Sequence, residues 1–202
     1  MIRRLFCAAA FAAALPALAQ PAVELEGQRY EPAATVAGQR LALNGAGIRY
    51  KAIFKVYTAG LYLQANATTP ETALAAPGPK RLHIVMLRDI DANELGKLFT
   101  RGMEDNASRA DFAKAIPGTL RMADLFAQKK RLAKGENFSV DWIPGSGTQI
   151  LVNGQPQGEP IKEPEFFSSL MRIWLGNKPA DAQLKDALLG KPPEPRRDMT
   201  TY

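Results

Sequence analysis

The sequence predicts an α+β fold in which a mainly antiparallel β-sheet is backed by a layer of helices on one face. Strand-like segments come first, helix-like segments follow, and the chain returns to strands before it ends in helices. Asn153-Gly154 lies between two short strand-like runs, which is a strong signal for a two-residue hairpin and so for antiparallel pairing. Because strands and helices do not alternate one by one, a doubly wound parallel sheet is not expected.

The first residues are expected to be a cleaved signal peptide. Arg3 and Arg4 precede the apolar run 5–18, and Ala17-Leu18-Ala19 carries the small residues of a cleavage site. The run is shorter than the roughly 20 residues that a membrane-spanning helix needs. We therefore expect export to the periplasm, with no stable membrane insertion after cleavage.

The rest of the chain is expected to form one domain, because its length matches a single hydrophobic core. The last residues are rich in proline and charge and carry no apolar pattern, which is typical of disorder. The expected division is a signal peptide over residues 1–19, a domain over residues 20–190 and a disordered tail over residues 191–202.

The composition argues against several kinds of site. Cys7 is the only cysteine and lies in the expected signal peptide, so the exported chain would have no disulfide, thiol nucleophile or thiolate metal ligand. His83 is the only histidine, so no metal site is expected, and no cofactor motif is found. The net charge is +6, but the basic residues are scattered without interleaved aromatic residues, so nucleic-acid binding is not expected.

Period-two patterns mark strands in the first half of the chain. Residues 39–43 alternate and predict a strand, Asn44-Gly45 predicts a turn, and residues 47–63 predict one long or interrupted β segment. Residues 20–32 lack such a pattern and are expected to be a loosely ordered lead-in. Two further elements are expected: a short helix with Thr69 as its N-cap, and a strand over 80–87.

Helix signals follow. Asp91 is expected to cap a helix that runs through Met103, and two further short helices are expected to begin near Ser108 and Leu120. The chain then returns to strands and closes with two amphipathic helices, each stopped by a glycine. These last elements are expected over 138–142, 148–152, 164–175 and 181–189.

The segment Leu43-Asn44-Gly45-Ala46-Gly47-Ile48-Arg49 carries the strongest functional signal, because it places an arginine among strand residues. A half-buried guanidinium needs an anionic partner, since leaving it unpaired is costly. That partner is either a protein carboxylate, which would make Arg49 structural, or the head group of a ligand. Gly45 and Gly47 are expected to be turn glycines and not a dinucleotide fingerprint, because the third glycine is missing and a strand follows.

This pattern resembles the chalcone isomerase family, whose members carry Gly-Ala-Gly-x-Arg before a strand that contains Thr-Ala and ends in Tyr-Leu. The resemblance extends to Met86-Leu87, to Ile173-Trp174-Leu175-Gly176 and to Leu184-Lys185, so it covers residues 41–190. The chain is most similar to the exported bacterial chalcone isomerase-like group. The resemblance implies an open-faced β-sandwich.

The resemblance also implies roles for individual residues. In the plant enzymes, the arginine that Arg49 matches guides a phenolate into attack on an enone, helped by a threonine of the next strand. Depending on the register, Tyr57 or Thr58 stands at that threonine position. Three further catalytic positions carry hydrogen-bonding side chains in those enzymes and are occupied here by Leu95, Gly102 and Ile173. The donors for a developing enolate are therefore missing, and no catalytic residue is expected.

A cation in an apolar pocket suits an amphiphile with an anionic head. Non-catalytic members of the resembled family bind fatty acids in this way. We therefore expect a periplasmic, non-catalytic protein that binds a fatty acid or similar apolar carboxylate. Two alternatives stay open: an intramolecular lyase or isomerase acting on an unknown substrate, and a structural protein whose pocket is filled by its own side chains. The expected ligand-binding residues are Arg49, Tyr57, Thr58, Leu95 and Ile173.

Overall fold

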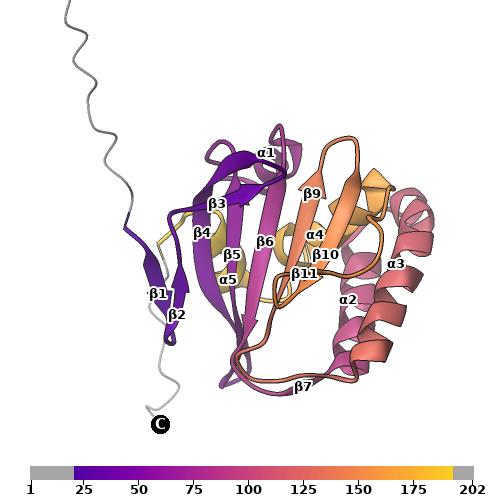
Figure 1. Ribbon diagram of the computed structural model, residues 1–202, viewed down its shortest axis with the longest axis horizontal. Coiled ribbons are helices and arrows are strands. Elements are labelled where there is room, and N and C mark those ends of the chain that lie inside the picture. The colour runs from indigo at the N-terminus through magenta and orange to yellow at the C-terminus, as the bar shows by residue number, and fades with distance from the viewer. Residues whose placement is uncertain (1–20, 193–202) are drawn as a thin grey trace, which may run out of the picture.

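The computed structural model describes residues 21–192 and has a seven-stranded antiparallel sheet with helices packed against it (Figure 1). The strand order is β11-β10-β9-β6-β5-β4-β3. The α+β class that the sequence predicts, an antiparallel sheet backed by helices, is confirmed. The expected signal peptide and residues 193–202 of the expected tail lie outside the described residues.

The sheet is built from strands of very different length. Its members are β3 Ala33–Val36, β4 Gln39–Lys51, β5 Phe54–Leu63, β6 Lys80–Met86, β9 Asn137–Ile143, β10 Gly147–Val152 and β11 Gln155–Pro156. Two small two-stranded units stand beside it: β1 Val23–Leu25 with β2 Gln28–Tyr30, and β7 Ile90–Asp91 with β8 Arg131–Leu132.

The hairpin β1–β2 replaces part of the expected loosely ordered lead-in, so that expectation was wrong. Glu26 and Gly27 both adopt positive φ at the turn, which suits a tight hairpin between antiparallel strands. Tyr30 then anchors the hairpin, because its ring is buried and its hydroxyl donates to Thr58 Oγ1 at 2.8 Å. A single buried tyrosine with a distant partner gives no periodic signal in the sequence.

The helices are α1 Pro70–Ala75, α2 Ala92–Asn106, α3 Arg109–Lys129, α4 Pro164–Leu175 and α5 Ala182–Leu188. Thr69 and Asp91 cap α1 and α2 through their side chains, as expected. Two expected short helices are instead the single helix α3, which contains Pro117. The helix packs closely against its neighbours at the residue after this proline, because a Cβ added to Gly118 would lie 2.6 Å from Ile161 Cγ2 and 2.7 Å from Phe166 Cδ2.

The Gly-Ala-Gly segment is not a turn, because it lies inside β4, which runs unbroken from Gln39 to Lys51. A Cβ on Gly45 would lie 2.0 Å from the carbonyl oxygen of Ala187, and one on Gly47 would lie 2.7 Å from the Ala187 Cβ. Both glycines therefore permit α5 to pack directly on the strand. Asn44 supports the same contact at a β-bulge, since its Nδ2 donates to the Leu188 carbonyl oxygen at 2.7 Å.

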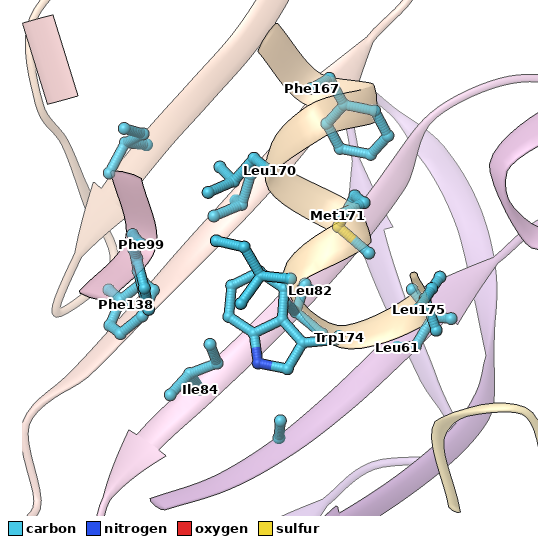
Figure 2. Packing of buried hydrophobic residues seen from close by; sticks show 14 of the residues in the cluster. Leu61, Leu82, Ile84, Phe99, Phe138, Phe167, Leu170, Met171, Trp174 and Leu175 are labelled. Carbon is cyan, nitrogen blue, oxygen red and sulfur yellow. The ribbon is translucent and has the colours of Figure 1, made fainter. Parts of the chain in front are cut away.

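The main core lies between the sheet and the helices (Figure 2). Figure 2 shows the indole of Trp174 projecting from α4 over the sheet, with Phe99 and Phe138 close to each other beside it. The Phe99 ring lies 5.4 Å from the Trp174 ring and 5.9 Å from the Phe138 ring, centroid to centroid. Within residues 21–192, no helix is long and apolar enough to cross a bilayer.

The turn before β9 is held by Glu136, which gives the fold a predictable pH dependence. Its carboxylate accepts hydrogen bonds from Lys129 Nζ at 2.7 Å, the Ala133 amide at 2.8 Å and Asn153 Nδ2 at 2.9 Å. These bonds, led by the one from Lys129, lower the pKa of Glu136 to about 2. The stabilisation is complete above the unfolded pKa of about 4.3 and is lost as pH falls toward about 2.

Glu136→Gln should therefore lower the free energy of unfolding at neutral pH, and the difference from the native protein should shrink as pH falls from about 5 to about 2. Urea unfolding at a series of pH values measures both curves. Glu104→Gln, at an exposed position of α2, is the control and should leave the pH dependence unchanged. A Glu136→Gln curve parallel to the native one over this range would rule out the Glu136 network as its cause.

Candidate functional site

A cleft of about 560 Å³ opens between one end of the sheet and helix α2. Its walls come from β4 and β5, from the segment between β6 and α2, from α2 itself, and from α4 and the link that follows it. The lining residues are Arg49, Lys51, Phe54, Val56, Tyr57, Arg88, Asp89, Ile90, Asp91, Glu94, Leu95, Leu98, Phe99, Arg101, Gly102, Asp105, Ile173, Lys178 and Ala180. The volume lies in the range of small-molecule sites, about 300–1,000 Å³.

Arg49 lies in the wall of this cleft, paired across strands with Tyr57. Its guanidinium carbon is 5.8 Å from the centroid of the Tyr57 ring, and its side chain is half-buried. No carboxylate of residues 21–192 forms an ion pair with it. The nearby carboxylate of Asp181, whose charge adds to burial in raising the pKa of Tyr57, accepts from the Tyr50 amide at 2.9 Å and caps α5. The cleft thus contains a cation that forms no direct ion pair in the described part of the chain.

Tyr57 is held beside Arg49 by Trp174, whose Nε1 donates to the Tyr57 hydroxyl oxygen at 2.8 Å. Because the hydroxyl accepts this bond, its own proton is left to donate to another group. Burial raises the pKa of Tyr57 to about 12, against the opposing effect of the Arg49 charge, so the hydroxyl stays protonated at neutral pH. Arg49 and Tyr57 together offer a charged donor and a neutral donor to an anion.

The interior of the cleft is apolar at three positions that the sequence analysis singled out. Leu95, Gly102 and Ile173 all line it, and Leu95 and Ile173 are 3% and 4% exposed. A Cβ on Gly102 would lie 3.1 Å from Ile173 Cγ1, so the glycine lets α2 and α4 approach each other at this point. These side chains give apolar contact and no hydrogen bond to a ligand.

Thr58 does not belong to the cleft, contrary to the expectation that it contributes to ligand binding. It follows Tyr57 in β5, so its side chain points to the opposite face of the sheet. There it is fully buried and accepts the hydrogen bond from Tyr30 at 2.8 Å. Of the five ligand-binding residues that the sequence predicts, the structure brings together Arg49, Tyr57, Leu95 and Ile173.

Two groups of side chains at this site were not expected from the sequence. Trp174 positions Tyr57 from a helix far along the chain, and only its burial could be inferred from the helical pattern. Phe54 and Leu98 line the cleft although they are 55% and 48% exposed. Phe54 lies close after Arg49 in the sequence, which is a signal that could have been used, whereas Leu98 lies far from the arginine motif along the chain.

Comparison with known proteins identifies the family and the fold of this chain. The family model described as chalcone isomerase-like matches residues 22–190. No curated protein matches this chain at a significant level. Among solved structures, a fatty-acid binding protein of Arabidopsis thaliana superposes with a TM-score of 0.66, at 13% identity, over 84% of this chain and 96% of that one. At this identity the likeness shows the fold alone. The family match covers most of the sequence, and the chain therefore belongs to the chalcone isomerase-like family.

Proposed function

We propose that this protein binds a fatty acid, or a similar apolar carboxylate, in the cleft and does so without catalysis. The observation that carries the proposal is the half-buried Arg49, which forms no direct ion pair within residues 21–192 and lies at one wall of an apolar cleft. A buried or half-buried cation is stabilised by an anion, and an acid with an alkyl chain supplies both an anion and apolar surface. The fatty-acid binding function of the Arabidopsis protein supports the same choice.

The head group would lie between Arg49 and Tyr57. The guanidinium can donate two parallel bonds to a carboxylate, and the Tyr57 hydroxyl can donate a third while it accepts from Trp174. The alkyl chain would contact the apolar side chains of α2 and α4. This arrangement disfavours the self-filled structural alternative, because a cleft of about 560 Å³ remains beside Arg49.

Native mass spectrometry of the purified protein tests the proposal. A co-purifying adduct with the mass of a fatty acid, or a one-to-one calorimetric titration with a saturated acid, is the expected result. The alcohol of the same chain length should bind more weakly, because it cannot pair with Arg49. Equal binding of acid and alcohol, or no binding of either, would contradict the proposal.

If the protein were an isomerase, it would turn over a substrate. We expect no enzymatic turnover of chalcones. Loss of one oxyanion donor lowers turnover by about 10²–10³ in a well-studied hydrolase, and the cleft offers apolar groups at Leu95, Gly102 and Ile173. Chalcone cyclisation monitored by absorbance should therefore match the uncatalysed rate. A turnover of about 1 s⁻¹ or faster, the low end of typical enzymes, would show that the protein is an enzyme.

We also propose that the protein is an exported bacterial member of the family that acts in the periplasm. The basic residues, apolar run and Ala17-Leu18-Ala19 at the start of the sequence support this. A binding protein in that compartment would carry a poorly soluble acid through water.

A further inference from the structure

The mouth of the cleft carries an apolar surface that the fold does not use. We call it the rim and define it as Lys51, Ile53, Phe54, Arg88 and Leu98. Ile53 is 83% exposed, Phe54 55% and Leu98 48%. A single exposed apolar side chain needs no explanation, but Phe54 and Leu98 both line the cleft and Ile53 directly precedes Phe54 at the hairpin tip.

The turn at the rim is unusual for a hairpin. Lys51 pairs with Phe54, so the turn between β4 and β5 consists of Ala52 and Ile53. Ala52 adopts φ of 53°, a conformation that glycine, asparagine or aspartate adopts more easily. Neither turn formation nor solubility therefore explains an alanine followed by an isoleucine at this exposed tip.

At the mouth of the cleft, the acidic side chains are engaged with other protein groups, whereas two of the basic side chains form no ion pair within residues 21–192. Among the acids that line the mouth, Asp89 pairs with Arg131 at 3.4 Å, Glu94 with Lys97 at 3.0 Å and Asp105 with Arg101 at 3.8 Å, and Asp91 caps α2. The cations Lys51 and Arg88 form no ion pair within residues 21–192, and Arg88 lies 5.1 Å from the Phe54 ring centroid. The rim therefore combines exposed apolar side chains with cations that have no counter-ion there.

We infer that the rim docks on an anionic lipid bilayer, with Ile53 inserted at the interface and Lys51 and Arg88 against the head groups. Apolar side chains flanked by basic ones are the pattern of reversible interfacial binding, and the area is too small for irreversible insertion. Docking would place the mouth of the cleft against the bilayer, in which long-chain acids dissolve. This purpose rests on the proposed function, whereas the docking itself does not.

Sedimentation with vesicles tests the inference without any fatty acid present. The protein should bind vesicles made from an equal mixture of phosphatidylcholine and phosphatidylglycerol, and bind pure phosphatidylcholine vesicles more weakly. High salt should reduce binding to the anionic vesicles, because exposed charges are screened. Ile53→Ser should weaken binding by roughly fivefold or more, since it removes most of the apolar surface of the tip. Ile53→Trp should strengthen it, because tryptophan favours the interface.

Leu120→Ser is the matched control, because Leu120 is 63% exposed on α3 and does not line the cleft. It should leave vesicle binding unchanged. Equal binding of the native protein, Ile53→Ser and Leu120→Ser would overturn the inference, as would equal binding to neutral and anionic vesicles. A dimer in light scattering that Ile53→Ser dissociates, together with no vesicle binding, would assign the rim to a second copy instead.

Failure of this inference is distinguishable from failure of the proposed function. Titration of a short, soluble acid such as decanoate is carried out without vesicles and depends on Arg49. Ile53 does not line the cleft, so Ile53→Ser should bind decanoate as the native protein does. Loss of vesicle binding with decanoate affinity retained is thus the expected pattern for that variant, and loss of both would show that Ile53→Ser disturbs the fold and not docking alone.

Discussion

Arg49→Ala should weaken the binding of a saturated fatty acid by roughly 10- to 150-fold. The reason is the loss of a charge-assisted hydrogen bond, which contributes on the order of 1.5–3 kcal/mol, at 1.4 kcal/mol per tenfold in affinity. Arg49→Lys should restore only part of the affinity, because an ammonium group cannot present the planar pair of donors. Isothermal titration calorimetry with each variant measures these dissociation constants.

Two comparisons separate the ligand role of Arg49 from a structural one. The alcohol of the same chain length should lose little affinity on Arg49→Ala, because it carries no charge to pair. Arg40→Ala is the matched control, since Arg40 is exposed in the same strand and does not line the cleft. If Arg49→Ala leaves acid binding unchanged while it lowers the melting temperature, Arg49 is a structural residue.

Trp174→Ala should destabilise the fold by about 3–5 kcal/mol, the usual cost of removing a buried tryptophan. Trp174 has no exposed surface, packs against Phe99 and bonds to Tyr57. Trp174→Phe keeps most of the packing and removes the hydrogen bond to Tyr57. It should therefore destabilise the fold less than Trp174→Ala does, while the Tyr57 side chain is held less firmly. We expect acid binding by Trp174→Phe to fall severalfold while the protein remains folded.

Urea unfolding gives both free energies, and calorimetry gives the affinity of the phenylalanine variant. Trp142→Phe, at the other tryptophan, is the control because Trp142 is half-buried and does not line the cleft. Full retention of acid affinity in Trp174→Phe would mean that the Trp174–Tyr57 bond does not position the head group.

The sequence predicts the parts of the fold that local chemistry determines. The caps at Thr69 and Asp91, and the helix that Gly176 ends, appear where side-chain chemistry and hydrophobic period place them. The elements that local patterns missed depend on distant contacts. Gly45 and Gly47 allow a helix from the other end of the chain to pack on the strand, and the β1–β2 hairpin is fixed by the hydrogen bond from Tyr30 to Thr58 of β5.

The candidate site also combines residues that local sequence predicts with contacts that only the folded chain shows. Arg49 is predicted from its strand, because an arginine in an apolar strand has few explanations. Tyr57 is predicted only through the resemblance to the chalcone isomerase family. Whether Tyr57 or Thr58 faces the cleft depends on a bulge between Arg49 and Tyr50, where the register shifts. The hydrogen bond from Trp174 and the exposed apolar rim require the folded chain, since each joins residues far apart in sequence.

A crystal structure of the protein with a bound saturated fatty acid tests the central claim most directly. We expect a carboxylate about 2.7–2.9 Å from the guanidinium nitrogens of Arg49. The Tyr57 hydroxyl should donate to the same carboxylate, and the alkyl chain should lie along Leu95 and Ile173. A cleft that stays empty at saturating acid, or a carboxylate bound away from Arg49, would contradict it.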